Sequence, residues 1–448
     1  MHVIIVGAGE VGWFLAQRLG AEGNDVVVVE RDEAIAAAIG AELDVQVLTG
    51  DATTPSVLRG ARVERADLFA AVTQHDEVNL LCSFLAKQAG VEQTIVRIQD
   101  PELRGPEGHA LRAAMGADVI IDPDADTADA ILGLVDAAGA DEVYPVSGGD
   151  LEMIGAVIGE ASPLAGQLLG DVTRTIGADL GFVIGALTHD GRTLLPGGDQ
   201  LLEAGDHVRV LTTTSAQHRT LELLDASLAA PHRAMVLGGG AIGARVAEML
   251  QARRTDVVLV ENDVARAGQL SERLHRVTIV QGDIQDVDFL DQESITEMDL
   301  VVAATGNDSA NVLACAFAAT GPRTFTIAVL HRLSLLPLVR RFGVDAALSP
   351  RTASANAVLH EIREGTGSVS TFLESDIEVD EMVVEPGSPA DGTPVANLDL
   401  GEVVLGAIVH ADGRGELIGG PSVLQAGDNV VVFVRPTSLP LVRKAFSA

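Results

Sequence analysis

The sequence predicts an α/β protein with two Rossmann-like, doubly wound parallel-sheet domains, each followed by a small β-rich α+β domain. Three observations support this prediction. A glycine-rich loop occurs twice, an acidic residue follows each loop at the same distance, and apolar strand-like runs alternate with helical stretches after each loop. One glycine loop would be weak evidence, but two in register, each with its acid, are strong. The chain therefore consists of two similar halves.

Each glycine loop follows a short apolar run and leads into a helix-like stretch. The first glycine of such a loop permits a tight turn, the second lets the backbone approach a pyrophosphate, and the third lets the helix pack closely on the sheet. The partly positive helix N-terminus, with its free N–H groups, suits a phosphate. We therefore expect nucleotide contacts from both loops, which are Gly7-Ala8-Gly9-Glu10-Val11-Gly12 and Gly238-Gly239-Gly240-Ala241-Ile242-Gly243.

An acidic residue ends the second strand-like run of each half. Gly7 and Gly238 are 231 residues apart, and so are Glu30 and Glu261. A carboxylate in this place can accept hydrogen bonds from both hydroxyls of an adenosine ribose, and it would repel a 2′-phosphate. The two acids therefore favour NAD(H), ATP or ADP over NADP, although Arg31 weakens this argument slightly in the first half.

Apolar runs with the length of strands continue after each loop. We expect parallel strands at 2–6, 25–30, 45–48, 68–72, 94–98 and 118–121, and again at 233–237, 256–260, 277–280, 299–303, 324–329 and 345–348. Each set is followed by an amphipathic helix, near 125–137 and 352–363, that could cross to a neighbouring subunit.

Further ligand contacts are expected where the third, fourth and fifth strands end, because ligands bind at that edge of a doubly wound sheet. Arg97 ends the fifth strand of the first half and could reach a phosphate or a neighbouring chain, or be an ordinary surface residue. The second half has Ala328 or Val329 there, so we expect the two sites to differ in ligand or affinity. The other expected contacts are Asp51, Ala52, Thr73, Gln74, Asp283, Thr305 and Gly306.

The repeat continues beyond the nucleotide folds. Residues 143–213 and 369–435 are short β-type runs, and each contains an Asp-Gly hairpin signal, at Asp190-Gly191 and Asp412-Gly413. With a linker near 229–231, we expect nucleotide domains at 1–140 and 232–366 and small domains at 141–226 and 367–448.

Composition narrows the functional class. The chain has 448 residues, 47% of them apolar, but no apolar run approaches the roughly 20 residues of a membrane helix. A net charge of −34 would repel nucleic acid and anionic lipid, so we expect neither as a partner. We also expect no signal peptide, no membrane insertion, and reduced packing roles for Cys82 and Cys315, as in a cytoplasmic protein.

Signals for catalysis are weak. A dehydrogenase needs a substrate domain that encloses a small molecule and supplies a placed acid–base group. The small domains are compact, and His75, His109, His189 and His410 show no partner pattern. We see no catalytic residue and no metal-ligand cluster, and we expect a protein that is not an enzyme. A soluble NAD-dependent oxidoreductase with a duplicated fold is the main alternative.

The order of domains and several motifs resemble the TrkA family, the peripheral regulatory subunits of bacterial Trk potassium uptake systems. Each half is similar to an RCK module, a regulator of K⁺ conductance. The match covers essentially the whole chain. The motifs that carry it are Val6-Gly7-Ala8-Gly9-Glu10-Val11-Gly12, Val72-Thr73-Gln74-His75-Asp76-Glu77-Val78-Asn79, Val236-Leu237-Gly238-Gly239-Gly240-Ala241-Ile242-Gly243 and Ala303-Ala304-Thr305-Gly306-Asn307-Asp308-Ser309-Ala310-Asn311.

The resemblance implies a cytoplasmic ring of four chains that docks beneath a TrkH-type membrane potassium transporter. It also implies that NAD(H) and adenine nucleotides bind the ring and alter its shape. The residues around Thr326-Ile327-Ala328-Val329 depart from the family pattern, which leaves open which nucleotide each half binds. A nucleotide sensor for a different membrane cation transporter is the remaining alternative.

Overall fold

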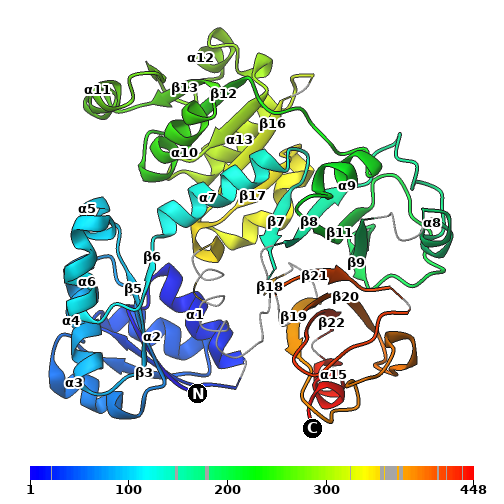
Figure 1. Ribbon diagram of the computed structural model, residues 1–448. Coiled ribbons are helices and arrows are strands. Elements are labelled where there is room, and N and C mark those ends of the chain that lie inside the picture. Colours follow the sequence, from blue (N-terminus) through cyan, green and yellow to red (C-terminus); the bar gives the residue numbers. More distant parts are fainter. Residues whose placement is uncertain are drawn as a thin grey trace. The chain divides into compact units, whose positions relative to one another are not determined.

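The computed structural model describes residues 1–21, 23–146, 150–176, 181–322, 324–353, 358, 371–372, 377–410, 413–419, 421–435 and 437–448. In these residues the two halves have the same architecture, a six-stranded parallel sheet followed by a five-stranded antiparallel sheet (Figure 1). The α/β fold class predicted from the repeated loops is therefore confirmed. The four domain boundaries given above remain predictions.

The two parallel sheets have equivalent strand orders, β3-β2-β1-β4-β5-β6 and β14-β13-β12-β15-β16-β17. This is the doubly wound order, in which the topological switch point lies between the central strand and the fourth strand of each half. The strands of the first sheet are β1 (His2–Val6), β2 (Asp25–Glu30), β3 (Gln46–Thr49), β4 (Leu68–Ala71), β5 (Gln93–Arg97) and β6 (Val119–Ile121). Those of the second are β12 (Arg233–Leu237), β13 (Asp256–Glu261), β14 (Thr278–Gln281), β15 (Leu300–Ala303), β16 (Phe325–Val329) and β17 (Ala346–Leu348).

Helices connect these strands in both halves. In the first half they are α1 (Glu10–Ala21), α2 (Glu33–Glu42), α3 (Pro55–Gly60), η1 (Val63–Arg65), α4 (Asp76–Gln88), α5 (Pro101–Arg104), η2 (Pro106–Gly108), α6 (His109–Met115) and α7 (Pro123–Asp136). In the second half they are α10 (Ala241–Ala252), α11 (Val264–Arg273), α12 (Val287–Gln292), η4 (Ile295–Glu297), α13 (Asp308–Ala318) and η5 (Leu333–Phe342). The η elements are 3₁₀-helices.

Burial explains why the parallel strands could be predicted from the sequence. Val26, Val27, Val28 and Val29 of β2 are all buried, as are the residues of β4 and β15. A strand covered by helices on both faces reads as a continuous apolar run instead of an alternating one. The chain then turns into the next helix, whose start is fixed by a capping acid, as with Asp32 before α2 and Asp263 before α11.

The two antiparallel sheets also correspond strand by strand. Their orders are β10-β9-β11-β8-β7 and β21-β20-β22-β19-β18. The strands are β7 (Glu142–Pro145), β8 (Leu151–Val157), β9 (Phe182–His189), β10 (Arg192–Leu194), β11 (His207–Thr213), β18 (Thr371–Phe372), β19 (Glu378–Val383), β20 (Val403–Val409), β21 (Gly415–Leu417) and β22 (Asn429–Val434). The accompanying helices are α8 (Leu169–Ile176), α9 (Gln217–Leu223), η6 (Val395–Asn397) and α15 (Leu439–Phe446).

The hairpin predicted at Asp190-Gly191 is present. Both residues have positive φ, +47° and +74°, and they join β9 to β10 with His189 opposite Arg192. In the second small domain Gly413 has φ +82°, whereas Asp412 lies outside the described residues. His189 and His410 show no partner pattern in the sequence, but in the fold each imidazole Nδ1 contacts a buried carboxylate, Asp206 at 2.6 Å and Asp428 at 3.0 Å.

Contacts divide the chain into two compact units. One contains Met1–Ala128 with Ser349–Glu361, and the other contains Asp129–Leu348 with Ile362–Ala448. Helix α7 therefore begins in the first unit, and its residues from Asp129 onward belong to the second, where Asp136 forms an ion pair with Arg253 after α10. The crossing to a neighbouring subunit that the sequence suggested stays a prediction. Most of the second predicted crossing helix, 352–363, lies outside the described residues.

Within the second unit, the two antiparallel sheets share one apolar core. Met153 and Leu211 of the first small domain belong to the same buried cluster as Val431 and Phe433 of the second. Gly185 of β9 faces the Phe433 ring so closely that a β-carbon would lie 2.2 Å from it. The small domains are therefore packed together by apolar burial and not only joined through the chain.

The remaining sequence expectations concern thiols and the membrane. Cys82 and Cys315 are buried free thiols, and burial raises the pKa of each to about 12, which fits inert packing residues. No helix among the described residues is long and apolar enough to cross a bilayer.

Candidate nucleotide-binding sites

Both glycine loops turn where the central strand of each parallel sheet ends. Gly7 and Gly238 have φ values of +97° and +105°, a left-handed conformation that favours glycine. The amide of Gly7 donates to the carbonyl of Val29 at 2.9 Å, and Gly238 donates to Val260 at 2.8 Å. The last glycine of each loop is equally constrained, since a β-carbon on Gly12 or Gly243 would lie 1.8 or 2.0 Å from the carbonyl oxygen of the first.

The middle glycines are different. A β-carbon on Gly9 or Gly240 would meet no described atom within 4 Å. These backbones face open space at the start of α1 and α10, where the free N–H groups of a helix lie. The tight turn and the close helix packing predicted for the first and last glycines are therefore present in both halves, whereas the approach of a pyrophosphate to the middle glycine stays a prediction.

Glu30 and Glu261 hold their glycine loops in place. One carboxylate oxygen of Glu30 accepts the Ala8 amide at 2.7 Å and the other accepts the Asp32 amide at 2.9 Å. Glu261 does the same with Gly239 and Asp263, both at 2.8 Å. A carboxylate has further lone pairs, so this arrangement leaves acceptors for ribose hydroxyls while fixing the side chain that would offer them. The proposed ribose contacts remain predictions.

A threonine and an asparagine lock the adjacent strand end in each half. Thr305 donates its amide (3.2 Å) and hydroxyl (2.5 Å) to Asn311, whose amide group donates to the carbonyls of Thr305 (2.9 Å) and Val329 (2.8 Å). Thr73, Asn79 and Arg97 form the same set of four bonds in the first half. The asparagines are fully buried. They keep the fourth and fifth strands at a fixed separation at the switch point.

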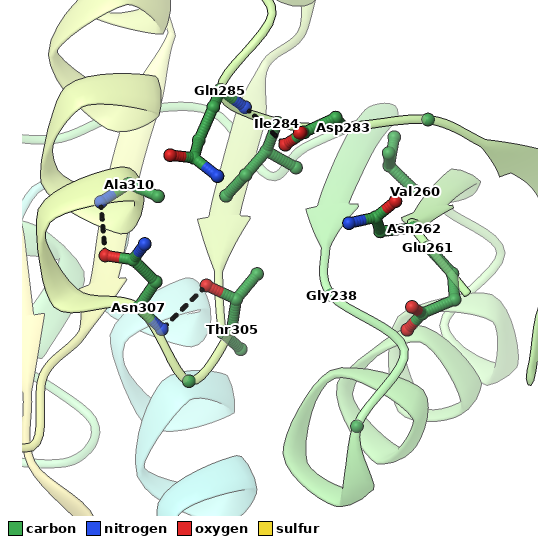
Figure 2. A pocket seen from close by; sticks show the side chains of 14 residues that line it. Gly238, Val260, Glu261, Asn262, Asp283, Ile284, Gln285, Thr305, Asn307 and Ala310 are labelled. Carbon is green, nitrogen blue, oxygen red and sulfur yellow. Dashed lines mark hydrogen bonds between the residues drawn. The ribbon is translucent and has the colours of Figure 1, made fainter.

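The second half encloses a pocket of about 430 Å³ above these strand ends (Figure 2). Residues from the glycine loop, the acid that ends β13, the turn after β14 and the turn after β15 line it, so the pocket runs across the carboxyl edge of the sheet. Its lining residues are Gly238, Gly240, Val260, Glu261, Asn262, Gly282, Asp283, Ile284, Gln285, Ala304, Thr305, Gly306, Asn307 and Ala310. Predicted contacts that do not line it are Gly239, Ala241, Ile242 and Gly243, of which all but Ala241 are buried.

The predicted residues of the first half occupy equivalent places. Asp51 is exposed after β3, and its pKa is lowered by hydrogen bonds from the Thr53 hydroxyl and amide, whereas Ala52 is buried. Arg31 and Gln74 are exposed. Arg97 is half-buried at the end of β5, and the strand pairing makes Val329 its counterpart, which resolves the earlier choice between Ala328 and Val329.

Two cationic side chains that the sequence analysis overlooked lie beside the second site, although neither is among the residues that line the pocket. Arg266 of α11 donates its Nε to the carbonyl of Gly239 at 3.0 Å, so a guanidinium lies against the glycine loop. Ile35 stands at the corresponding position of α2 in the first half. Arg332, just after β16, donates its Nε to Asp308 at 3.2 Å. The second site therefore lacks the charge at the Arg97 position but has two cations placed elsewhere. Only the position of Arg266 one helical turn into α11 hinted at this in the sequence.

Comparisons with known proteins agree with this geometry. The model of the TrkA-N domain matches residues 3–123 and 234–350, and that of the TrkA-C domain matches residues 153–225. The chain is 34% identical over its full length to the Trk system potassium uptake protein TrkA homolog of Archaeoglobus fulgidus, covering 100% of both. It is 30% identical to the Trk system potassium uptake protein TrkA of Halomonas elongata, over 97% of this chain and 96% of that protein.

Solved structures resemble the fold over nearly the whole chain. The GsuK RCK domain matches with a TM-score of 0.61 at 20% identity, covering 99% of this chain and 94% of that one. The GsuK channel bound to NAD matches with a TM-score of 0.62 at 19% identity, covering 99% and 78%. At such identities the structural likeness shows the fold alone. The family-model matches and the full-length relatives go further, and on them the chain belongs to the TrkA family.

Proposed function

We propose that this protein is a nucleotide-sensing regulatory subunit of a membrane potassium transporter. The observation that carries the proposal is the duplication of a glycine loop held by a carboxylate, Glu30 in the first half and Glu261 in the second. The potassium uptake role comes from the names of the full-length TrkA relatives.

We infer that NAD(H) and the adenine nucleotides ADP and ATP are the ligands. The open backbone at Gly9 and Gly240 can approach a pyrophosphate, and the acids favour a free ribose 2′-hydroxyl over a 2′-phosphate. One solved relative of similar fold is the GsuK channel bound to NAD, and another is GsuK bound to ADP. The unequal cations, Arg97 in one half and Arg266 in the other, support different nucleotide preferences for the two sites.

The proposed partner is a TrkH-type membrane transporter, bound at the cytoplasmic face by a ring of four chains. A ligand can shift a conformational equilibrium only by the difference between its affinities for the two states. Each bound nucleotide would therefore favour one ring shape, and a coupling of about 1–3 kcal/mol for each ligand is typical of allostery. Several sites acting together would move the elements of the partner that open the ion path.

The experiment that tests nucleotide sensing is calorimetric titration of the full chain with NADH, NAD, ADP and ATP. We expect the Glu30→Ala variant to lose the first site and Glu261→Ala to lose the second, because each substitution removes the group that fixes its loop. The double variant should release no heat with any of the four ligands. If the unmodified chain binds none of them, the proposed function is wrong.

The alternative of an NAD-dependent oxidoreductase finds little support at the pocket. The two carboxylates that line it are already engaged, Glu261 with backbone amides and Asp283 with the Gln285 amide at 2.9 Å. Neither is arranged as a free acid–base group, and fold alone does not imply catalysis. Oxidation of bound NADH in the presence of candidate substrates, measured as loss of the nicotinamide absorbance, would favour the oxidoreductase instead.

A further inference from the structure

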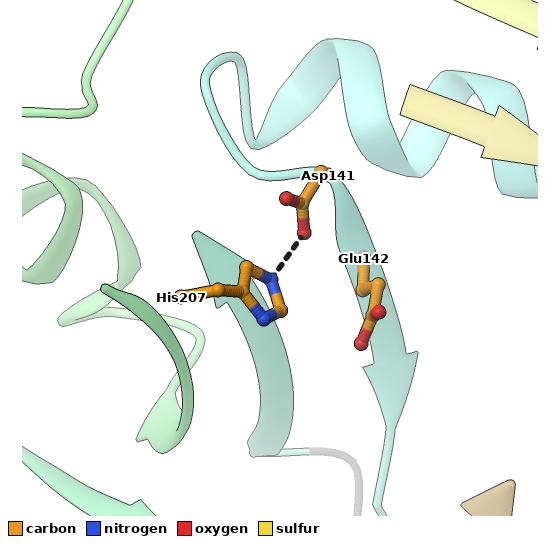
Figure 3. A group of neighbouring side chains, drawn as sticks. All are labelled: Asp141, Glu142 and His207. Carbon is orange, nitrogen blue, oxygen red and sulfur yellow. Dashed lines mark hydrogen bonds and ion pairs between the residues drawn. The ribbon is translucent and has the colours of Figure 1, made fainter. Parts of the chain in front are cut away.

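A group of charged side chains, buried except for the partly exposed Arg340, joins the second nucleotide domain to the first small domain. Asp141 and Glu142 stand at the start of β7 and His207 at the start of β11, and Figure 3 shows the His207 ring directed at Asp141. Arg340 reaches this group from the last turn of η5, placing its Nη2 2.6 Å from Asp141 and 2.8 Å from His207 Nε2. Arg209 completes the group.

The charges in this group balance without a bound ion. Arg209 makes two hydrogen bonds of 2.8 Å to the two carboxylate oxygens of Glu142, a bidentate pair. Arg340 is the second guanidinium, and Asp141 is its carboxylate. Although Asp141, Glu142 and His207 have the spacing of metal ligands, the two guanidinium groups already neutralise the two acids. The group is therefore an ion-pair network between domains.

Asp141 depends on Arg340. Burial by itself would raise the pKa of Asp141, but His207, Arg340 and Arg209 together lower it, so the carboxylate is ionised in the fold. His207 Nε2 lies 3.0 Å from Asp141 and 2.8 Å from Arg340, and one ring nitrogen can serve only one of these as donor or acceptor. Withdrawing Arg340 would leave the buried Asp141 with His207 and with Arg209, whose guanidinium is already paired with Glu142, so the loss of this partner is unfavourable.

The element that carries Arg340 has an unusual conformation. Helix η5 is a 3₁₀-helix of ten residues, Leu333–Phe342. Such helices rarely exceed three or four residues, and longer stretches often mark a hinge or strain. The corresponding part of the first half is formed instead by α5, η2 and α6. The ten-residue 3₁₀-helix is thus a property of the second half.

The other end of η5 is attached to the nucleotide pocket. Asp308 follows the pocket residue Asn307 directly, and its carboxylate accepts the amides of His331 and Arg332, both at 2.9 Å. The guanidinium of Arg332 also contacts Asp308 (3.2 Å) and the Ser309 hydroxyl (3.4 Å), while 59% of its side chain is exposed. A phosphate bound at the turn after β15 would compete with Asp308 for this exposed cation.

We propose that the second nucleotide site is coupled to the first small domain through η5. The Arg340–Asp141 contact connects the end of η5 to that domain. This proposal rests on the proposed function, because it requires a nucleotide in the second pocket. A phosphate draws the Arg332 side chain, and with it the backbone amides of His331 and Arg332, away from Asp308. The start of η5 is then released, and Arg340 loosens its contact with Asp141. Coupling of this kind is reciprocal, so weakening the Arg340–Asp141 contact must change nucleotide affinity at the pocket.

The test measures ADP affinity in a chain whose first site is disabled by Glu30→Ala. In that background Arg340→Gln and Asp141→Asn should each tighten ADP binding roughly fivefold or more, the lower end of typical allosteric coupling. Combining them should add little, because both break one contact. Arg340→Lys keeps the positive charge but loses the planar guanidinium. Its ADP affinity should therefore lie between that of Arg340→Gln and that of the Glu30→Ala chain itself. The neighbouring Arg341→Gln is the matched control and should leave the affinity unchanged.

Hydrogen exchange on the otherwise unmodified chain provides a second measurement that does not depend on the variants folding. ADP should speed amide exchange at 142–145 as well as at 331–342. Unchanged or weaker ADP binding in Arg340→Gln, or unchanged exchange at 142–145, would overturn the coupling. A Glu30→Ala chain that releases no heat with ADP would instead refute nucleotide binding at the second site, so the two failures are distinguishable.

Discussion

At the scale of single residues, the two glycine loops show how one sequence motif divides its tasks. Gly243 leaves no room for a side chain, since its β-carbon would lie 2.0 Å from the Gly238 carbonyl, whereas Gly240 faces open space. The first requirement belongs to folding and the second to ligand approach. The same division applies to Gly12 and Gly9.

We therefore predict opposite outcomes for two alanine substitutions in the second loop. Gly243→Ala should destabilise the domain by about 1–3 kcal/mol, the usual cost of overpacking. Gly240→Ala should leave the thermal unfolding temperature nearly unchanged but weaken ADP binding, because its methyl group occupies the path of the phosphates. Thermal unfolding and calorimetry on both variants check this. Equal effects of the two substitutions on stability would contradict the assignment.

Asn311 is a second residue whose contribution to stability can be measured. Asn311→Ala leaves the amide of Thr305 and the carbonyls of Thr305 and Val329 without their partner, and each unsatisfied buried group costs about 1–3 kcal/mol. Denaturant unfolding should show a clear loss of stability. Leu313→Ala on the same helix, whose side chain is 68% exposed, is the control and should change stability little. If Asn311→Ala leaves the free energy of unfolding unchanged, the hydrogen bonds of Asn311 to Thr305 and Val329 do not contribute to stability.

At the scale of elements, the hairpins of the two small domains share a histidine–aspartate pair. His189 ends β9 and His410 directly follows the equivalent β20, and each contacts an aspartate that precedes the next long strand, Asp206 or Asp428. The hydrogen bond and charge of the aspartate raise the pKa of each imidazole above its ordinary value of 6.5. Glu203 and Asp190 near His189, and Glu416 near His410, act in the same direction.

The sign of the pH dependence follows from this upward shift. Each pair contributes fully to stability below pH 6.5, and the contribution disappears as pH rises through the higher pKa of the folded state. NMR titration of the imidazoles should show both pKa values above 6.5, and Asp206→Asn should lower that of His189 but not that of His410. An unshifted His189 in the unmodified chain would contradict the assignment.

At the scale of the whole molecule, duplication made most of the fold predictable. Strands such as 2–6, 25–30 and 233–237 were predicted at their observed bounds, because buried parallel strands read as uninterrupted apolar runs. The glycine roles followed from the steric demands of a strand–turn–helix. Contacts between distant segments leave no such local pattern. The pairing of Arg340 with Asp141, and the 3₁₀ conformation of η5, therefore emerged only from the structure.

The shared core of the two small domains predicts that they lose stability together. Phe433 is fully buried against the first small domain, and Phe433→Ala should cost about 3–5 kcal/mol. Hydrogen exchange should then accelerate in both β9 and β20. Val383→Ala, at a position 40% exposed on β19, should leave both strands protected. Acceleration confined to the second domain would show that the domains unfold independently.

The central claim is that the paired nucleotide crevices regulate potassium transport instead of catalysing a reaction. The most direct measurement is potassium flux through a reconstituted TrkH-type transporter with this protein bound, recorded while NADH, NAD, ADP and ATP are titrated. The account predicts that at least one nucleotide changes the flux, and that Glu30→Ala combined with Glu261→Ala abolishes the response. A flux that all four nucleotides leave unchanged, although they bind the protein, would contradict it.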